Sequence, residues 1–169
     1  MVAAANPHAA VAGIEILALG GSAVDAAIAV QTVLGLVEPQ SSGIGGGAFM
    51  LHYDAEARMV RAYDGRETAP ATAGPDLFLG PDGKVMDWRD AALSGRSVGA
   101  PGVVQLMWLA HQAHGKLPWR QLFEPAIRLA RQGFSVSARL NTMLEGDEWL
   151  ATRAETRDYF YRATGDGTH

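Results

Sequence analysis

Residues 24–37 form the longest apolar segment, which is interrupted by Asp25 and Gln31, and this segment constrains the fold more than any other part of the sequence. Ser22 is predicted to cap a helix there, with Asp25 reaching back from the third helical position. The apolar side chains within residues 26–34 would cover most of the helix circumference, which indicates a helix buried between two layers. Pro39 cannot continue the backbone hydrogen bonds, so the helix should end just before it.

Caps and periodicity predict further helices on both sides of this segment. The first should run from about Pro7 to Leu19, and one apolar face of it should carry Val11, Ile14, Leu17 and Ala18. A later helix should follow Gly102 and end at Gly115, and it should bury the following side chains: Val103, Val104, Leu106, Met107 and Ala110. Short helices are predicted to begin near three more residues, Pro118, Pro125 and Ser137.

Two strand-like runs, Ala48–Tyr53 and Arg58–Tyr63, are separated by four residues, which is a spacing typical of a hairpin. The first run is apolar nearly throughout, so we expect its strand to be covered on both faces. The glycine run of residues 43–47 precedes this strand, and it lacks the lysine and hydroxyl of a phosphate-binding loop. We therefore expect the glycines to permit close backbone packing, and we expect no nucleotide site.

Composition bounds the class of protein. A chain of 169 residues with 48% hydrophobic and 19% charged residues is predicted to pack as one globular unit, which we treat as a single partial domain, 1–169. The net charge of −4 provides no electrostatic basis for binding nucleic acid. The absence of cysteine excludes disulfides and thiolate chemistry, and the five histidines show no ligand spacing, so we expect no metal and no cofactor. Residues 147–169 are polar and are predicted to be a weakly held tail.

Arg66 is the best candidate for a binding residue. It lies within the segment Asp64–Pro70, and the backbone around it is rich in glycine and serine. An arginine guanidinium can donate two parallel hydrogen bonds to a carboxylate, so this segment predicts a site for a small carboxylate. Glu67 is a weaker candidate, which could orient Arg66. The alternative is an ordinary salt bridge for Arg66 and a solvated charge pair for Glu67.

Several motifs in order resemble the γ-glutamyltranspeptidase (glutathione hydrolase) family, over about the first 140 residues. They are the segments 1–7, 20–27, 38–47, 64–70, 94–102 and 115–119. The resemblance implies the α/β (α+β) fold of the N-terminal-nucleophile hydrolases, an αββα sandwich in the complete protein. This chain would be the N-terminal part of the large subunit, mostly helical with a small number of strands.

The resemblance also implies an activity. Members autoprocess into two subunits, and a threonine at the start of the small subunit cleaves γ-glutamyl amides such as glutathione, with transfer to water or to amino-acid or peptide acceptors. By resemblance, Arg66 pairs with the donor's α-carboxylate and Glu67 supports the same site. No catalytic residue is expected in this chain, because Thr168 with His169 lacks the flanking residues of the nucleophile. The chain alone should be inactive.

Two alternatives remain from other classes: a glutaryl-type cephalosporin acylase relative, and a non-enzymatic fragment that binds a partner or itself through uncovered strand edges. The resemblance implies a periplasmic or secreted complete protein. The chain itself has no basic region ahead of an apolar stretch and thus no recognisable signal peptide.

Overall fold

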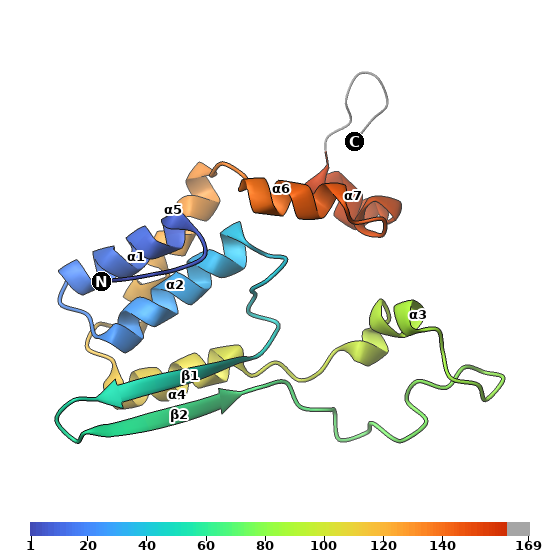
Figure 1. Cartoon of the computed structure of the whole chain (residues 1–169), viewed down its shortest axis with the longest axis horizontal. Helices are drawn as coiled ribbons and strands as arrows, with labels where there is room; N and C mark the ends of the chain where they lie inside the picture. The colour runs from blue at the N-terminus through green and yellow to red at the C-terminus, as the bar shows by residue number, and fades with distance from the viewer. Residues whose placement is uncertain (162–169) are drawn as a thin grey trace.

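The computed structural model describes residues 1–161 of the chain, which fold into helices stacked over one β-hairpin (Figure 1). Helix α1 (Pro7–Ala18) begins where the Asn6 side chain accepts the backbone N–H of His8. Helix α2 (Ala23–Val37) begins with the predicted capping box, in which Ser22 and Asp25 exchange hydrogen bonds between side chain and backbone. Both predicted helices are confirmed.

The face by which α1 packs on α2 differs from the prediction. Its buried residues are small ones together with an isoleucine: Ala9, Ala12, Gly13 and Ile16. A Cβ atom on Gly13 would lie 2.9 Å from side-chain atoms of Val2 and of Val30, so α1 and its neighbours approach too closely for a larger residue. Val11 and Ile14 are consequently more than half exposed, so the apolar face predicted from periodicity is not the face that packs.

Strands β1 (Ala48–Asp54) and β2 (Met59–Gly65) pair antiparallel, with Met50 opposite Tyr63. Helix α4 (Val103–His114) covers the face that carries these two residues. On the other face, Phe49, Leu51 and Tyr53 are 67%, 75% and 61% exposed. The expectation that β1 is covered on both faces is therefore wrong for the described residues, because α4 packs on one face of the two-stranded sheet and the apolar side chains of the other face are exposed.

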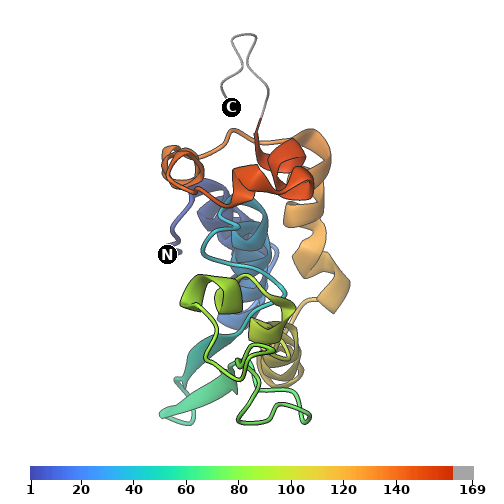
Figure 2. The ribbon, with the colours of Figure 1, turned by 90° about the vertical axis from the view of Figure 1, so that its right-hand side faces the viewer.

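A long connection leads from β2 to α4; it projects away from the helices in Figure 1 and faces the viewer in Figure 2. It contains the short helix α3 (Trp88–Ala92) and the 3₁₀ turn η1 (Gly95–Ser97), neither of which we predicted. The sequence signal for α3 is Asp87, whose side chain accepts the backbone N–H of Arg89. The predicted turn at residues 80–83 is present, and Gly83 adopts a positive φ of 75° there.

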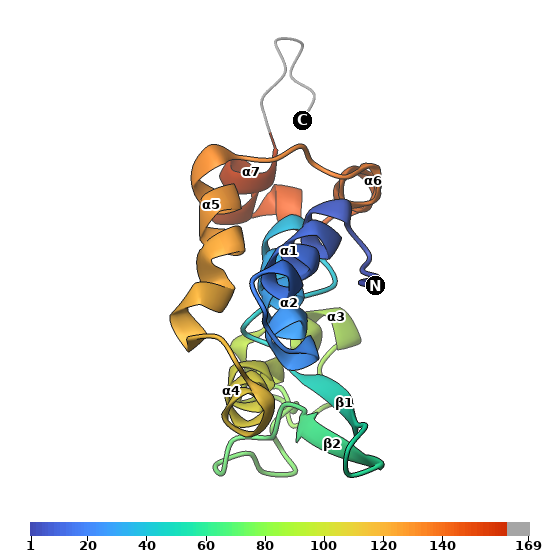
Figure 3. The same cartoon turned by 90° about the vertical axis from the view of Figure 1, so that its left-hand side faces the viewer.

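After α4 the chain returns along the helices through η2 (Trp119–Phe123) and α5 (Glu124–Gln132), as Figure 3 shows. Helix α6 (Ala138–Glu145), η3 (Leu150–Thr152) and α7 (Ala154–Phe160) complete the described chain. The helix after Gly102 is confirmed, but Val104 is 45% exposed and not buried. Within the predicted tail, η3 and α7 are helical and Tyr161 donates to the Leu144 carbonyl. The weak attachment of residues 147–169 stays a prediction, and 162–169 lie outside the described residues.

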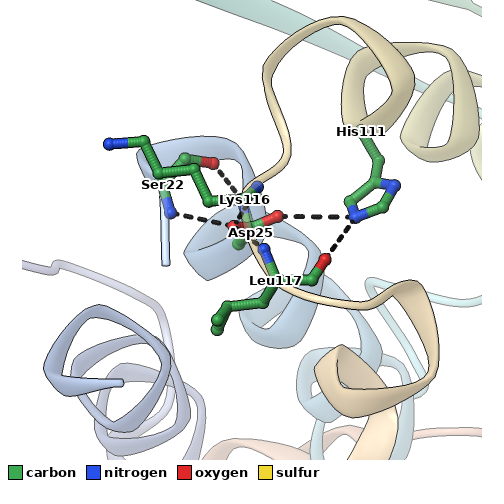
Figure 4. Close-up of polar contacts among 5 residues, drawn as sticks. All are labelled: Ser22, Asp25, His111, Lys116 and Leu117. Atoms are coloured by element: carbon green, nitrogen blue, oxygen red, sulfur yellow. Dashed lines mark hydrogen bonds and ion pairs between the residues drawn. The ribbon is translucent and has the colours of Figure 1, made fainter. Parts of the chain in front are cut away.

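One buried carboxylate joins α2 to the end of α4 (Figure 4). Asp25 is fully buried, and its Oδ2 accepts the backbone N–H groups of Ser22, Lys116 and Leu117 at 2.9, 2.9 and 3.1 Å. The Nε2 of His111 donates to the Leu117 carbonyl at 2.8 Å and lies 3.7 Å from the Asp25 Oδ1. The same carboxylate thus caps one helix and holds the loop that follows another.

Candidate functional site

A cavity of about 550 Å³ opens where the hairpin ends and the long connection begins. Its lining comes from four places in the sequence: Gly45, residues 66–70, residues 77–78 and residues 96–99. The predicted binding residues Arg66 and Glu67 therefore line the same cavity. Its volume lies within the range of small-molecule sites.

Arg66 presents its charge to solvent at this cavity. Its backbone N–H donates to the Asp64 side chain at 2.9 Å, and this contact fixes the turn that follows β2. The Arg66 side chain is 67% exposed and the Glu67 side chain is 33% exposed. The Nε of Arg66 lies 3.8 Å from the Oε2 of Glu67. A pair at this distance and exposure is weak, so the guanidinium keeps donors for a ligand.

Glu67 lies in a cradle of glycines. A Cβ atom on Gly47 would fall 2.5 Å from the Oε2 of Glu67 and 2.7 Å from the Gly65 carbonyl. A Cβ atom on Gly99 would fall 2.9 Å from the Cβ of Glu67. These distances are shorter than real contacts, so both positions require glycine for Glu67 to occupy its place.

Backbone hydrogen bonds tie the segments of the site together. The Gly46 carbonyl accepts the N–H groups of Gly102 and Val103 at 3.2 and 3.1 Å, so it satisfies donors at the start of α4. Thr68 and Ala100 form an isolated antiparallel bridge. The predicted close packing of the glycine run thus consists of contacts to the end of the hairpin and to the beginning of α4.

Arg96 is a second arginine of the cavity, and our sequence reasoning did not single it out. Its Nη1 donates to the carbonyls of Leu77 and Leu79 at 3.1 and 2.9 Å. These bonds hold the loop that carries Leu77 and Phe78 against the cavity. The only sequence signal is an arginine within the motif 94–102. Nothing in that motif indicates the hydrogen bonds to Leu77 and Leu79, which lie 19 and 17 residues earlier in the chain.

The two serines of the glycine-rich segment accept hydrogen bonds from side chains of other elements. The Ser42 hydroxyl accepts from the Gln31 side chain at 2.8 Å, and the Ser41 hydroxyl accepts from Arg139 at 3.1 Å. Glu38, just before them, is buried and accepts from Asn6 at 2.7 Å, and this hydrogen bond is the main cause that lowers the pKa of its carboxyl group.

A histidine cluster lies under the hairpin, outside the cavity. The rings of His52 and His114 are 4.0 Å apart, and the Tyr63 hydroxyl is 2.8 Å from the Nε2 of His114. Burial is the largest cause that lowers the pKa of His114, and the charges of His52 and Arg61 lower it further. The charge of Asp54 raises it. Within residues 1–161 no three His, Asp or Glu side chains are arranged to hold a metal ion. Thr168 and His169 lie outside the described residues.

Comparison with known sequences shows relatives along almost the whole chain. The model of the family described as gamma-glutamyltranspeptidase matches residues 9–168. A glutathione hydrolase proenzyme of Bacillus subtilis (strain 168) is 38% identical over 160 residues, which is 95% of this chain and 27% of the relative. Glutathione hydrolase 3 of Arabidopsis thaliana is 41% identical over 136 residues, 80% of this chain and 20% of the relative. The chain spans about a quarter of the length of these relatives.

Solved structures show the same fold. The γ-glutamyltranspeptidase from Pseudomonas nitroreducens complexed with L-DON matches with a TM-score of 0.84 and 36% identity, over 94% of this chain and 47% of that one. The cephalosporin acylase from Bacillus halodurans matches with a TM-score of 0.71 and 30% identity, over 90% of this chain and 27% of that one.

These likenesses place the helices and hairpin within the fold of the N-terminal-nucleophile hydrolases, so the predicted fold class is confirmed. The mostly helical character with few strands is confirmed as well. The chain belongs to the γ-glutamyltranspeptidase family. In the part of the chain that the structure describes, no helix combines the length and apolarity needed to cross a bilayer.

Proposed function

We propose that this chain supplies the donor-binding part of an enzyme that cleaves γ-glutamyl amides such as glutathione. The observation that carries the proposal is Arg66, an exposed guanidinium at the 550 Å³ cavity with only a weak partner in Glu67. Arg66 would bind the α-carboxylate of the γ-glutamyl donor through two parallel hydrogen bonds. Glu67 would limit the orientations of Arg66.

The chemical step needs groups beyond this chain. A threonine hydroxyl downstream in the same polypeptide would attack the γ-carbonyl, forming a glutamyl ester and releasing the amine. Water or an acceptor amine would then attack the ester carbon and return the hydroxyl to threonine. The names of the relatives support such a precursor, because several are proenzymes. The 169-residue chain alone is expected to be inactive.

The open face of the hairpin is a reason to expect that a second part of the polypeptide packs on it. Phe49, Leu51 and Tyr53 form an exposed apolar row on β1. In the αββα sandwich that the family implies, a second sheet would cover this face. We propose that the small subunit from the same precursor covers it, which would remove the cost of exposing this surface.

The proposal is tested by release of 4-nitroaniline from γ-glutamyl and glutaryl anilides by the complete gene product, with the 169-residue chain as the control. A preference for the γ-glutamyl donor is expected. Arg66→Ala should lower kcat/KM about 10- to 100-fold, because a charge-assisted hydrogen bond contributes about 1.5–3 kcal/mol. Arg66→Lys keeps the charge but lacks the two parallel donors of the guanidinium, so its kcat/KM should lie between those of Arg66→Ala and the unmodified enzyme. Activity of the control chain would contradict the downstream nucleophile.

The likeness to the B. halodurans cephalosporin acylase supports one alternative function. An acylase would prefer the glutaryl anilide, which lacks the α-amine, so the same assay separates the two enzymes. The non-enzymatic alternative rests on the apolar row of β1. It predicts strong self-association of the 169-residue chain by sedimentation and an inactive complete gene product, whereas a monodisperse monomer would count against it.

Export of the complete polypeptide to the periplasm or the medium is part of the proposal, on the ground of the family. Fractionation of producing cells tests it, since activity confined to the cytoplasmic fraction would contradict export.

A further inference from the structure

Arg96 presents a fixed guanidinium to the cavity that also holds Arg66. Its Nη1 donates to the Leu77 carbonyl at 3.1 Å and to the Leu79 carbonyl at 2.9 Å, and it lies 3.5 Å from the Met86 sulfur. All three acceptors are neutral. The guanidinium is thus held in one place without neutralisation of its charge.

No carboxylate of the described residues neutralises Arg96. The ion pairs within residues 1–161 involve other cations, and Arg66 has Glu67 within 3.8 Å whereas Arg96 has no acidic partner. A cavity with two arginines and one glutamate in its lining carries an excess of positive charge. It therefore favours a ligand with more than one negative group.

The donors of Arg96 that remain have the geometry of a carboxylate site. The side-chain hydrogen bonds of Arg96 within the described residues all use Nη1. The edge formed by Nε and Nη2 offers two parallel N–H groups, which match the two oxygens of a carboxylate. A guanidinium already fixed by its other nitrogen loses little rotational freedom on binding.

We propose that Arg96 binds a second carboxylate, on the amine side of the γ-glutamyl bond, while Arg66 binds the α-carboxylate. This inference rests on the proposed function. The amine side is the leaving group of the donor in the first step and the acceptor in the second, because the acceptor amine takes the place that the leaving amine vacates. A γ-glutamyl peptide with a free C-terminal carboxylate, and a peptide acceptor of the same kind, carry this group.

Two chromogenic donors isolate the effect. γ-Glutamyl-4-nitroanilide and γ-glutamyl-3-carboxy-4-nitroanilide differ by one carboxylate on the leaving aniline. The quantity to measure is the ratio of their kcat/KM values, carboxylated over uncarboxylated, in the complete gene product without acceptor. In Arg96→Gln this ratio should fall about tenfold, as expected for loss of one charge-assisted hydrogen bond. Arg96→Lys should retain part of the preference, because it keeps the charge.

Arg89→Gln is the matched control. Arg89 is another exposed arginine of the same connection, and its guanidinium lies over the Trp149 ring and outside the cavity lining. In Arg89→Gln the ratio of kcat/KM for the carboxylated donor to that for the uncarboxylated donor should equal the ratio in the unmodified enzyme. A second arm compares glycylglycine with glycylglycinamide as acceptors, which tells whether the carboxylate bound is that of the leaving group or that of the acceptor. A change in either arm supports the proposal.

The following outcomes overturn it. Equal losses for both members of each pair in Arg96→Gln would show that Arg96 only holds the loop at Leu77. If that variant does not fold, the unmodified enzyme decides: its preference for the carboxylated donor should decrease when salt rises from 50 mM to 1 M, and a ratio independent of salt contradicts the proposal. An enzyme that cleaves the uncarboxylated donor without these effects refutes the Arg96 site alone. An enzyme that cleaves neither donor refutes the proposed function as well.

Discussion

The carboxylate of Asp25 accepts the backbone N–H of Leu117 at 3.1 Å, across 92 residues of sequence. The same oxygen accepts two more N–H groups, those of Ser22 and Lys116. Helix α2, which lies at the centre of the helical layer, is thereby joined to the end of α4, which packs on the hairpin. A single buried carboxylate links the core to the element that supports the cavity.

Asp25→Ala should lower the stability of the complete gene product by about 3 kcal/mol, because three partly buried backbone N–H groups would lose a charged acceptor. Asp25→Asn should cost less, since an amide oxygen can replace Oδ2. The measurement is the midpoint of thermal unfolding. Asp82→Ala is the matched control, because Asp82 is an exposed carboxylate 3.5 Å from Lys84 and its loss should change stability by less than about 0.5 kcal/mol. Equal effects of Asp25→Ala and Asp82→Ala would contradict the proposed link.

Only the local part of the Asp25 contacts could be predicted from the sequence. Its hydrogen bond with Ser22 is a capping box, which has a fixed spacing of three residues. Its contact with Leu117 depends on the angle at which α2 and α4 cross, and no local sequence pattern predicts that angle. The two helices and the hairpin were likewise predictable, because each has its own periodicity and its own turn residues.

The buried faces were less predictable than the elements. Val11 and Ile14 are the larger apolar residues of α1, yet Ala12 and Gly13 are buried, since close packing of α1 on α2 requires small side chains. At the site, Arg66 could be identified from a motif. Arg96 could not, because its contacts are backbone carbonyls in a loop that carries no sequence signature.

Gly47→Ala should disrupt the candidate site. The added Cβ would lie 2.5 Å from the Glu67 Oε2 and 2.7 Å from a backbone carbonyl, so Glu67 and the chain beside Arg66 must move. We expect KM for γ-glutamyl-4-nitroanilide to rise about tenfold, since misplacement of a charged hydrogen bond loses roughly 1–3 kcal/mol. Gly43→Ala provides the comparison, because nothing lies within 4 Å of its Cβ position and Gly43 does not line the cavity. If both variants keep the same KM, the glycine cradle has no role in binding.

Glu67→Gln should have a small effect. The pair with Arg66 is 3.8 Å long and both side chains are partly exposed, so removal of the charge should raise KM only about threefold. The amide keeps the shape of the side chain and therefore isolates the charge. Steady-state kinetics of the complete gene product with the γ-glutamyl anilide measure the change. An unchanged KM would remove Glu67 from the binding site and leave Arg66 as the only binding residue that the sequence predicts.

The contact between the hairpin and α4 should weaken in acid because of His114. Burial is the largest cause that lowers its pKa, followed by the charges of His52 and Arg61, and the opposing charge of Asp54 is smaller. The folded protein therefore binds a proton at His114 less readily than the unfolded chain, whose histidines titrate near 6.5. Stability from this group is fully present above about pH 6.5 and is lost as pH falls from there towards the lowered pKa.

His114→Gln is the variant that tests this effect, since glutamine does not titrate and can still contact the Tyr63 hydroxyl. The thermal midpoints of the unmodified and variant proteins should differ most at pH 7.5 and approach each other at pH 5. His52→Gln should make the pH dependence shallower, because it removes a charge that lowers the pKa of His114. His8→Gln, at the start of α1 and away from the hairpin, should leave the slope unchanged. Parallel pH profiles for His114→Gln and the unmodified protein would show that acid acts on the fold through other groups.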